Sequence, residues 1–244
     1  MGRLAGKTAI VTGAARGQGA AIARRFVEEE ATVLITDVLA LEGEALAAEL
    51  GPRASFRTLD VSDEAGWADI VGSLLAAHGR IDILVNNAGL FQPKSIRETS
   101  AADFDHHYRV NMLGVFLGMK AVIEPMIAAG GGSIVNTGSN ASLRAIPGMF
   151  AYGASKWGVR GISKNAAIDL APHGVRVNCV LPGVIDTPMY HANGPEKMKQ
   201  YDAMLPLGRR GKPEEIAALV TYLVSEEASY FAGAELTMDG AVFA

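Results

Sequence analysis

Near the N-terminus, residues 8–19 read TAIVTGAARGQG. A run of strand-forming residues leads directly into Gly13, Gly17 and Gly19, and a stretch with helical periodicity follows. Glycines at this spacing permit a tight turn, let the backbone approach a bound pyrophosphate and let the helix pack closely on the strand. Because a helix N-terminus favours anions, the segment predicts the phosphate-binding βα junction of a dinucleotide-binding fold.

The remainder of the chain alternates strand-like and helix-like segments. Apolar runs typical of strands occupy residues 8–12, 32–36, 55–59, 81–85, 133–137, 175–181 and 235–238. Helical patterns rich in Ala, Leu and Glu occupy residues 19–30, 42–50, 64–78, 100–129, 151–171 and 213–225. Residues 9–11 and 83–85 are apolar throughout, as expected of parallel strands that helices cover on both faces. The sequence therefore predicts an α/β Rossmann fold, a doubly wound seven-stranded parallel sheet with helices on both faces.

The composition is that of a folded, enzyme-sized protein: 244 residues, 49% of them hydrophobic and 20% charged. No linker or repeat divides the chain, so residues 1–244 are expected to form a single domain. The formal net charge is -4, and Lys and Arg do not cluster as binding to a phosphate backbone requires. Nucleic acid is therefore not an expected partner.

Cysteine usage and hydropathy bound the cellular setting. Cys179 is the single cysteine, which excludes an intramolecular disulfide, and no Cys/His spacing suits a structural metal. The N-terminal residues show no export signal, and no apolar run approaches the roughly 18 to 20 residues that span a bilayer. We therefore expect a cytoplasmic protein with no bound metal and no membrane partner.

The end of the second predicted strand carries the next signal, because ligands of doubly wound sheets bind beyond the carboxyl ends of the strands. Asp37 lies there, about 20 residues after the glycines, where a carboxylate accepts hydrogen bonds from an adenosine ribose. This carboxylate would repel a 2′-phosphate, which favours NAD over NADP. Arg16 favours NADP more weakly, and a plain helix cap is the alternative role for Asp37.

The third and fourth predicted strands end in small, acidic or amide residues, which would flank an adenine and its ribose without filling their space. These residues are Asp60, Val61, Asn87, Ala88 and Gly89. Each one alone is equally typical of a turn. Their agreement with the glycine turn predicts a nicotinamide dinucleotide cofactor, and Asp37 assigns it as NAD.

Tyr152 and Lys156 lie four residues apart at the start of a predicted helix, so their side chains share one face. A phenol has a pKa near 10, and a nearby ammonium is expected to lower that pKa by stabilising the phenolate. Such a phenol can give or take the proton of an alcohol while a nicotinamide carries the hydride. The alternative is a core tyrosine beside a solvated lysine. Ser139 ends the preceding strand and is placed to bond the same substrate oxygen, unless it serves only as a turn or cap residue.

Together these motifs resemble the short-chain dehydrogenase/reductase family over essentially the whole chain. The resemblance is carried by the glycine turn, Asn86-Asn87-Ala88-Gly89, Asn111, Ser139, Tyr152, Lys156 and Pro182-Gly183. It implies that Tyr152 is the general acid/base, that Ser139 orients and polarises the carbonyl, and that Lys156 binds the nicotinamide ribose and tunes Tyr152. Asn111 would hold a water that links Lys156 to solvent. The other residues that the resemblance assigns to the cofactor are Gly13, Arg16, Gly17, Gln18, Gly19, Pro182, Gly183, Ile185 and Thr187.

Within this family the chain is similar to bacterial NAD-dependent hydroxysteroid dehydrogenases of the 3α/20β type. Residues 37–39, 114–120, 152–161 and 233–236 carry this similarity, and because most of them are scaffold it implies NAD and a bulky apolar alcohol rather than a steroid in particular. Residues expected to line the substrate pocket are mostly apolar, and they are Phe91, Asn140, Leu143, Met149, Met189 and Tyr190. None is an Arg or Lys that would bind a carboxylate or phosphate, so a neutral apolar or cyclic alcohol or ketone is expected. The long irregular stretch at about residues 183–206 is expected to form a substrate lid.

Two other functions stay open. An NADPH-dependent β-ketoacyl-acyl-carrier-protein reductase would share the catalytic residues, but Asp37 opposes NADPH, and residues 126–133 and 171–175 hold no Lys or Arg that would dock an acidic carrier. A non-catalytic nicotinamide sensor would not need the complete set of catalytic residues.

The family resemblance also implies a homotetramer, paired through two long helices and the C-terminal segment. Residues 111–127 are apolar enough to leave one helix face for a partner.

Overall fold

The structure, a computed structural model, describes residues 2–244 and contains a sheet of seven parallel strands in the order β3-β2-β1-β4-β5-β6-β7. The strands are β1 Thr8–Thr12, β2 Thr32–Asp37, β3 Ala54–Thr58, β4 Ile83–Asn86, β5 Gly132–Thr137, β6 Val175–Pro182 and β7 Glu235–Met238. This order and the single direction confirm the predicted single-domain Rossmann fold. Strand ends differ from the predicted ones by one or two residues, which is the usual imprecision at frayed ends.

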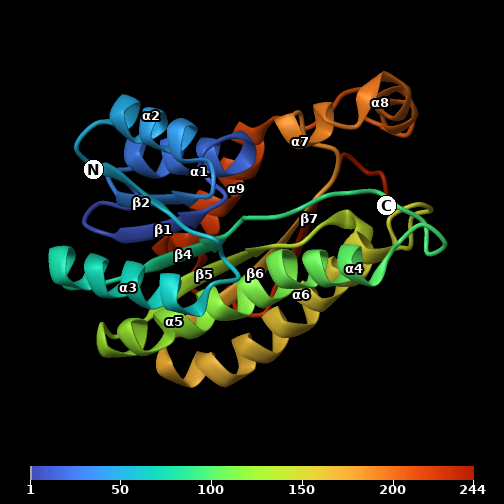
Figure 1. Cartoon of the computed structure of the whole chain (residues 1–244). Helices are drawn as coiled ribbons and strands as arrows, with labels where there is room; N and C mark the ends of the chain where they lie inside the picture. The colour runs from blue at the N-terminus through green and yellow to red at the C-terminus, as the bar shows by residue number, and fades with distance from the viewer. Residues whose placement is uncertain (1) are drawn as a thin grey trace.

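Helices cover both faces of the sheet (Figure 1). On one face lie α1 Gly17–Glu28, α2 Ala40–Leu50 and α9 Pro213–Val224. On the other lie α3 Glu64–His78, α4 Ala101–Tyr108, α5 Gly114–Ala128 and α6 Phe150–Leu170. The inner strands, such as β1 and β4, are therefore buried on both sides, which explains why their residues are apolar without alternation, whereas the edge strands β3 and β7 are only partly buried.

Successive residues of β1 contribute side chains alternately to two hydrophobic cores, one on each face of the sheet. Ala9 and Val11 pack with α1 and α9, whereas Ile10 points to the opposite face and packs with α3 and α5. All three side chains are fully buried. Burying an aliphatic side chain as large as Val or Ile contributes about 1.5–3 kcal/mol, so the two cores together stabilise the sheet strongly.

The strand order reverses between β1 and β4, and this switch fixes where a ligand crevice opens. Gly13 follows β1 with φ +60°, a conformation that other residues rarely adopt. A Cβ atom there would lie 2.6 Å from the Cα atom of Ala88, which follows β4. Only glycine lets these two strand ends come so close.

Two regions differ from the sequence-based expectation. The predicted helix over residues 100–129 is interrupted by a π-helical segment at Arg109–Leu113, between α4 and α5. The stretch predicted as irregular contains two short helices, α7 Pro188–His191 and α8 Gly194–Asp202. Thr187 caps α7 by accepting a hydrogen bond from the backbone of Tyr190 at 3.3 Å, and a proline opens each helix. The pairs Thr187-Pro188 and Gly194-Pro195 were therefore helix-start signals in the sequence, and the prediction of an irregular stretch overlooked them.

One helical stretch among the described residues, Ala101–Ala128, is long and apolar enough to cross a membrane, contrary to the expectation that no run approaches this length. Val115, Val122 and Met126 of this stretch pack in the core beneath the sheet. Core packing accounts for part of its apolar composition, and a core helix can reach this length and hydropathy without a membrane.

Candidate active site

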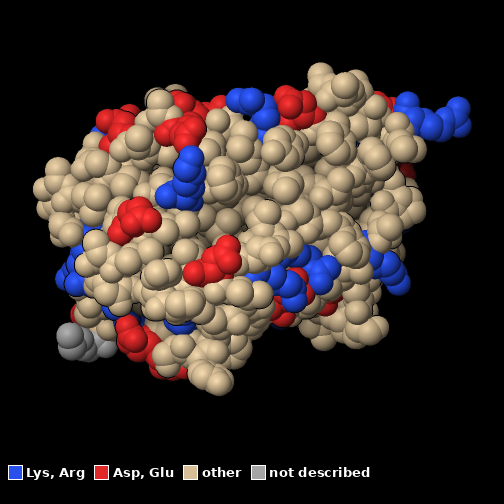
Figure 2. Space-filling view, turned by 90° about the horizontal axis from the view of Figure 1, so that it is seen from below, with Lys and Arg blue, Asp and Glu red and all other residues tan. Residues whose placement is uncertain are grey.

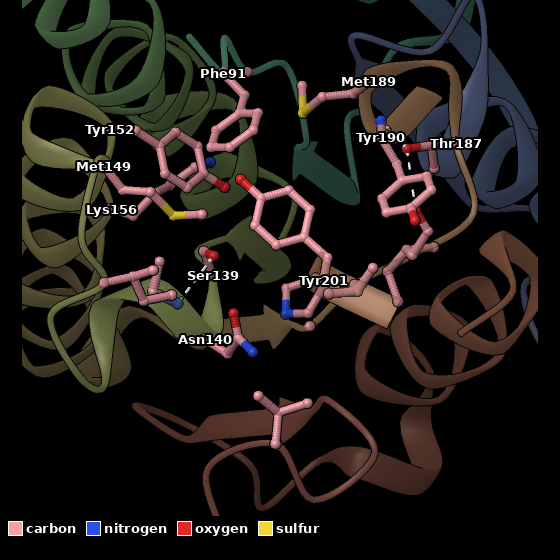
Figure 3. A pocket seen from close by; sticks show the side chains of 18 of the residues that line it. Phe91, Ser139, Asn140, Met149, Tyr152, Lys156, Thr187, Met189, Tyr190 and Tyr201 are labelled. Atoms are coloured by element: carbon pink, nitrogen blue, oxygen red, sulfur yellow. Dashed lines mark hydrogen bonds between the residues drawn. The ribbon is translucent and has the colours of Figure 1, made fainter. Parts of the chain in front are cut away.

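Two cavities meet at the carboxyl ends of the strands. The outer cavity is lined by residues of the glycine turn and of the β2, β3 and β4 ends, with Arg16, Asp37, Asp60, Val61 and Ala88 among them. The inner pocket is lined by Ser139, Tyr152 and Lys156 together with mostly apolar side chains (Figure 3). Both cavities share Gln18, Asn87, Gly89, Thr187 and Met189. They form one continuous groove from Asp37 to Tyr152, with an outer end that carries charged side chains and an inner end that is mostly apolar.

Asp37 closes the far end of the outer cavity. Its carboxylate accepts hydrogen bonds from the backbone N–H groups of Ala15, at 3.0 Å, and Leu39, at 3.1 Å. The side chain is therefore held in place by the glycine turn and by the start of α2. Asp60 is held similarly by the backbone of Ser62, at 2.9 Å. Arg16 is exposed at the rim of the same cavity.

The glycine turn and Gln18 fit a dinucleotide. Gly19 does not line either cavity; a Cβ atom there would lie 2.3 Å from the carbonyl oxygen of Gly13, so glycine keeps α1 packed against the turn. The side-chain oxygen of Gln18 is buried without a hydrogen-bond partner among the described residues, at the junction of the two cavities. Such an orphaned acceptor costs about 1–3 kcal/mol unless a ligand donates to it. An amide-bearing nicotinamide supplies such donors.

Tyr152 lies at the start of α6 with its ring against Phe91, whose ring centroid is 4.7 Å away in an edge-to-face arrangement. Burial raises the pKa of the Tyr152 phenol, and the nearby Ser139 hydroxyl partly offsets this rise. The expected net lowering of the Tyr152 pKa is therefore not found, because burial outweighs the effect of the Lys156 ammonium, which lies 5.9 Å from the ring centroid and still favours the phenolate. The phenol is neutral at physiological pH and is poised to donate a proton.

Lys156 is almost fully buried one helical turn further along α6. Its ammonium donates a hydrogen bond to the carbonyl oxygen of Thr137 at 2.8 Å and lies 5.9 Å from the centroid of the Tyr152 ring. Burial lowers the pKa of Lys156 to about 8. The lysine is thus anchored to the end of β5 and keeps most of its charge near neutral pH.

Ser139 serves as a cap, the alternative role predicted for it, while its hydrogen bond to a substrate oxygen remains a prediction. Its hydroxyl oxygen accepts a hydrogen bond from the backbone of Ala141 at 3.1 Å, which caps a short 3-10 turn, Asn140–Ser142. The cap orients the Ser139 side chain toward the inner pocket, on the same side as Tyr152 (Figure 3). The structure therefore brings Ser139, Tyr152 and Lys156 together.

Asn111 sits behind these three residues in the π-helical segment, fully buried. Its side chain accepts from the backbone N–H of Leu90 at 2.7 Å and donates to the carbonyl of Leu90 at 3.0 Å and to the hydroxyl of Ser155 at 2.9 Å. Ser155 in turn donates to the carbonyl of Tyr152 at 2.7 Å. Asn111 thus ties the β4 loop to the first turn of α6, and its predicted relay water remains a prediction.

Most of the predicted pocket residues line the inner pocket, as do four further residues assigned to the cofactor. They are Phe91, Asn140, Met149, Met189 and Tyr190, and Pro182, Gly183, Ile185 and Thr187. Leu143 does not: it packs against the core beneath the sheet. Leu143 follows the turn that Ser139 caps, and that turn directs its side chain away from the pocket.

Several lining residues were missed by the sequence analysis. They are Ile146 before α6, Tyr201, Met204 and Leu205 around the end of α8, and Val242 and Phe243 at the C-terminus. Asp239 holds the C-terminal pair by accepting from the backbone of Ala241 at 3.1 Å and of Phe243 at 3.2 Å. The position of residues 239–243 after the last strand was a signal available in the sequence, because every other strand end borders the groove.

A groove at the switch point of a Rossmann sheet, ending in a Tyr, a Ser and a buried Lys, is typical of a nicotinamide-dependent oxidoreductase that interconverts alcohols and ketones. The chain belongs to the short-chain dehydrogenase/reductase family: the family model described as enoyl-(acyl carrier protein) reductase matches residues 13–242. Sequence similarity to curated proteins extends over the whole chain.

The relatives include dehydrogenases of cyclic alcohols. A 3-alpha-(or 20-beta)-hydroxysteroid dehydrogenase of Mycobacterium tuberculosis is 42% identical over 100% of this chain and 92% of its own length. A cyclopentanol dehydrogenase of Comamonas testosteroni is 42% identical over 98% of each chain. A trans-4-hydroxycyclohexanecarboxylate dehydrogenase of Sinomonas cyclohexanicum is 40% identical over 98% of this chain and 93% of its own.

Proposed function

We propose that this protein is an NAD(H)-dependent dehydrogenase that interconverts apolar cyclic secondary alcohols and their ketones. The convergence of Ser139, Tyr152 and Lys156 on an otherwise apolar pocket, continuous with the outer cavity, carries this proposal. A bound nicotinamide supplies or accepts the hydride at the carbinol carbon. Side chains of the protein transfer the proton to or from the substrate oxygen.

In the direction of ketone reduction, the neutral Tyr152 phenol donates its proton to the carbonyl oxygen as that oxygen gains negative charge. The Ser139 hydroxyl donates a hydrogen bond to the same oxygen and holds the carbonyl in position. The Lys156 ammonium stabilises the phenolate that remains. Oxidation runs the same steps backwards, so it requires Tyr152 to be deprotonated first.

The choice of NAD rests on the outer cavity. Asp37 is fixed by two backbone hydrogen bonds, so its negative charge cannot easily move away from a 2′-phosphate. Arg16 is exposed in comparison, and a solvated guanidinium gains little from one additional charge. NAD is therefore favoured over NADP.

The choice of substrate rests on the inner pocket and on the relatives. Phe91, Ile146, Met149, Met189 and Phe243 supply an apolar wall that fits a hydrocarbon ring. Three relatives whose names specify a steroid, a cyclopentanol or a substituted cyclohexane extend this assignment to alcohols on rings. Residues 183–206, with α7 and α8, are proposed as the lid over this pocket.

The proposal includes a cytoplasmic homotetramer. Five half-exposed aromatic side chains of α4, α5 and α6 offer a face for association: Phe104, Tyr108, Phe116, Phe150 and Trp157. In Figure 2, which looks onto the side of the molecule formed by α5 and α6, much of the surface carries no charge. Light scattering in solution tests this, and a monomer would contradict it.

The test of the function is the appearance of NADH absorbance when the purified protein is mixed with NAD and a panel of secondary alcohols. Turnover of cyclic alcohols with NAD is the expected result. Turnover only with NADP would contradict the cofactor choice. Activity confined to NADPH and an acyl-carrier-protein thioester would replace the proposed function by that of a fatty-acid reductase.

A further inference from the structure

We infer that Tyr201 is a specificity-determining residue that restricts the inner pocket to single-ring alcohols and ketones. This inference rests on the proposed function and narrows its substrate class. The names of the relatives differ in the size of the substrate: one specifies a steroid, which has fused rings, and two specify a single ring. The inner pocket of this chain favours the smaller group.

Tyr201 lies near the C-terminal end of α8 and lines the inner pocket. Figure 3 shows its ring extending into the middle of the pocket, with its hydroxyl directed toward the side that holds Tyr152. Phe91 and Met149 lie on that same side, so an alcohol presented to Tyr152 must fit beside the Tyr201 ring. The ring therefore occupies space that a longer substrate would need.

A network around Asp202, the next residue, holds Tyr201 in this position. Arg210 donates to both oxygens of the Asp202 carboxylate, from Nε at 2.9 Å and from Nη2 at 2.8 Å. Tyr190 of α7 donates its hydroxyl to the same carboxylate at 2.8 Å, and the Arg210 guanidinium lies 4.3 Å from the centroid of the Tyr190 ring. The end of α8 is thus attached both to α7 and to the segment that leads into α9.

The volume of the inner pocket supports a restriction to small substrates. Its cavity volume is about 170 Å³. A cavity of about 150 Å³ accommodates one benzene ring, whereas pockets for larger, drug-sized ligands begin at about 300 Å³. Because the pocket shares Gln18, Asn87 and Gly89 with the outer cavity, a nicotinamide takes part of this volume as well. A pocket of this size therefore favours a single small ring over four fused rings beside the Tyr201 side chain.

Two substitutions separate the size of Tyr201 from its polarity. Tyr201→Ala removes the ring and opens the pocket toward α8. Tyr201→Phe keeps the ring and removes only the hydroxyl, so it is the matched control. If the ring restricts size, only the alanine variant gains access for fused-ring substrates.

The experiment compares kcat/KM for cyclohexanol and for a 3α-hydroxysteroid in the wild type and in both variants. We expect the wild type to prefer cyclohexanol and Tyr201→Ala to shift the ratio toward the steroid by at least about tenfold, the range that a change in pocket size produces. Tyr201→Phe is expected to change the ratio by less than about threefold. A wild type that prefers the steroid, or an unchanged ratio in Tyr201→Ala, would overturn the inference.

A binding measurement keeps the inference separate from the proposed function. Stabilisation against thermal unfolding is measured with cyclohexanone and with a 3-ketosteroid, in the wild type, Tyr201→Ala and Tyr201→Val. We expect the steroid to stabilise only the two smaller variants, and equal stabilisation of the wild type would overturn the inference. Failure of all forms to oxidise any alcohol would contradict the proposed function instead, while the binding result still decides the role of Tyr201.

Discussion

The groove of this protein has two sides of different origin. The strand-end side comprises the glycine turn, Asp37, Ser139, Tyr152 and Lys156, which follow or face the carboxyl ends of the strands. The lid side comprises the proposed lid at residues 183–206, with α7 and α8, Arg210 that pairs with it, and the C-terminal residues 239–243. The first side is positioned by the sheet, whereas the second is positioned by side-chain contacts between segments outside it.

This difference assigns separate tasks to the two sides. Lys156 is anchored to the carbonyl of Thr137 at the end of β5, so catalytic geometry follows from a strand in the centre of the sheet. Tyr201 is positioned through Asp202, Arg210 and Tyr190, all of them on the lid side. Substitutions on the strand-end side should therefore change the chemical step or the cofactor, and substitutions on the lid side should change the substrate.

The largest expected effect is that of Tyr152→Phe. Loss of the general acid/base is expected to lower kcat by about 10²–10⁴-fold for both directions, because the Tyr152 phenol is the group that exchanges the proton with the substrate oxygen in the proposed mechanism. Binding of NADH, measured by its fluorescence, should change by less than about threefold, since the ring and its contact with Phe91 remain. Activity within about tenfold of the wild type would mean that Tyr152 is not the proton donor.

The pH dependence distinguishes the two reaction directions. Since burial raises the pKa of Tyr152, the phenolate required for oxidation is scarce at neutral pH, and kcat for oxidation should rise by up to about tenfold per pH unit from pH 6 to 8. The rise should flatten above about 8, where Lys156 loses the charge that stabilises the phenolate. Ketone reduction should not show this rise. An oxidation rate that is constant from pH 6 upward would contradict the raised pKa.

Asp37→Asn tests whether the strand-end side of the groove selects NAD over NADP. Removing the negative charge is expected to shift the ratio of kcat/KM for NADP over NAD by about tenfold toward NADP, equivalent to about 1.4 kcal/mol. Asp60→Asn, in the same cavity, serves as the matched control and should leave that ratio within about twofold. An equal shift in both variants would show that general electrostatics of the cavity, not Asp37, selects the cofactor.

The smallest expected effect belongs to the lid network. Arg210→Met removes the pair with Asp202, which is partly exposed and therefore stabilises by no more than about 1 kcal/mol. KM for a cyclic alcohol should rise by about two- to fivefold while kcat changes little. Arg209→Met is the control, since Arg209 pairs with Glu215 at the start of α9 and not with the lid. A fall in kcat alone would contradict the assignment of this network to substrate binding.

The sequence was sufficient to predict what the sheet positions. The alternation of apolar runs and helical patterns predicts the seven parallel strands and both covering layers, because strands buried on both faces must be apolar throughout. Residues next to strand ends, such as Gly13, Asn87 and Ser139, could be expected to share one groove for the same reason. Their distance along the chain is irrelevant once the strands are parallel.

The sequence was not sufficient where several distant segments build one wall. Tyr201 and Phe243 reach the pocket through the Asp202 network and the turn at Asp239, and no local pattern records either arrangement. Leu143 was assigned to the pocket by its proximity to Ser139, but the 3-10 turn at Asn140–Ser142 directs it into the core. The pKa of Tyr152 depends on burial and on the distance to Lys156, neither of which follows from a four-residue spacing.

The transfer of deuterium from a cyclic alcohol labelled at its carbinol carbon to NAD tests the proposed chemistry most directly. Mass spectrometry of the cofactor after incubation with the wild type is expected to show one deuterium per NADH formed, and at least about a hundredfold less labelled NADH with Tyr152→Phe in the same time. Formation of the ketone without deuterium in the cofactor, or equal labelling by Tyr152→Phe, would contradict the assignment of Ser139, Tyr152 and Lys156 as the site of hydride transfer.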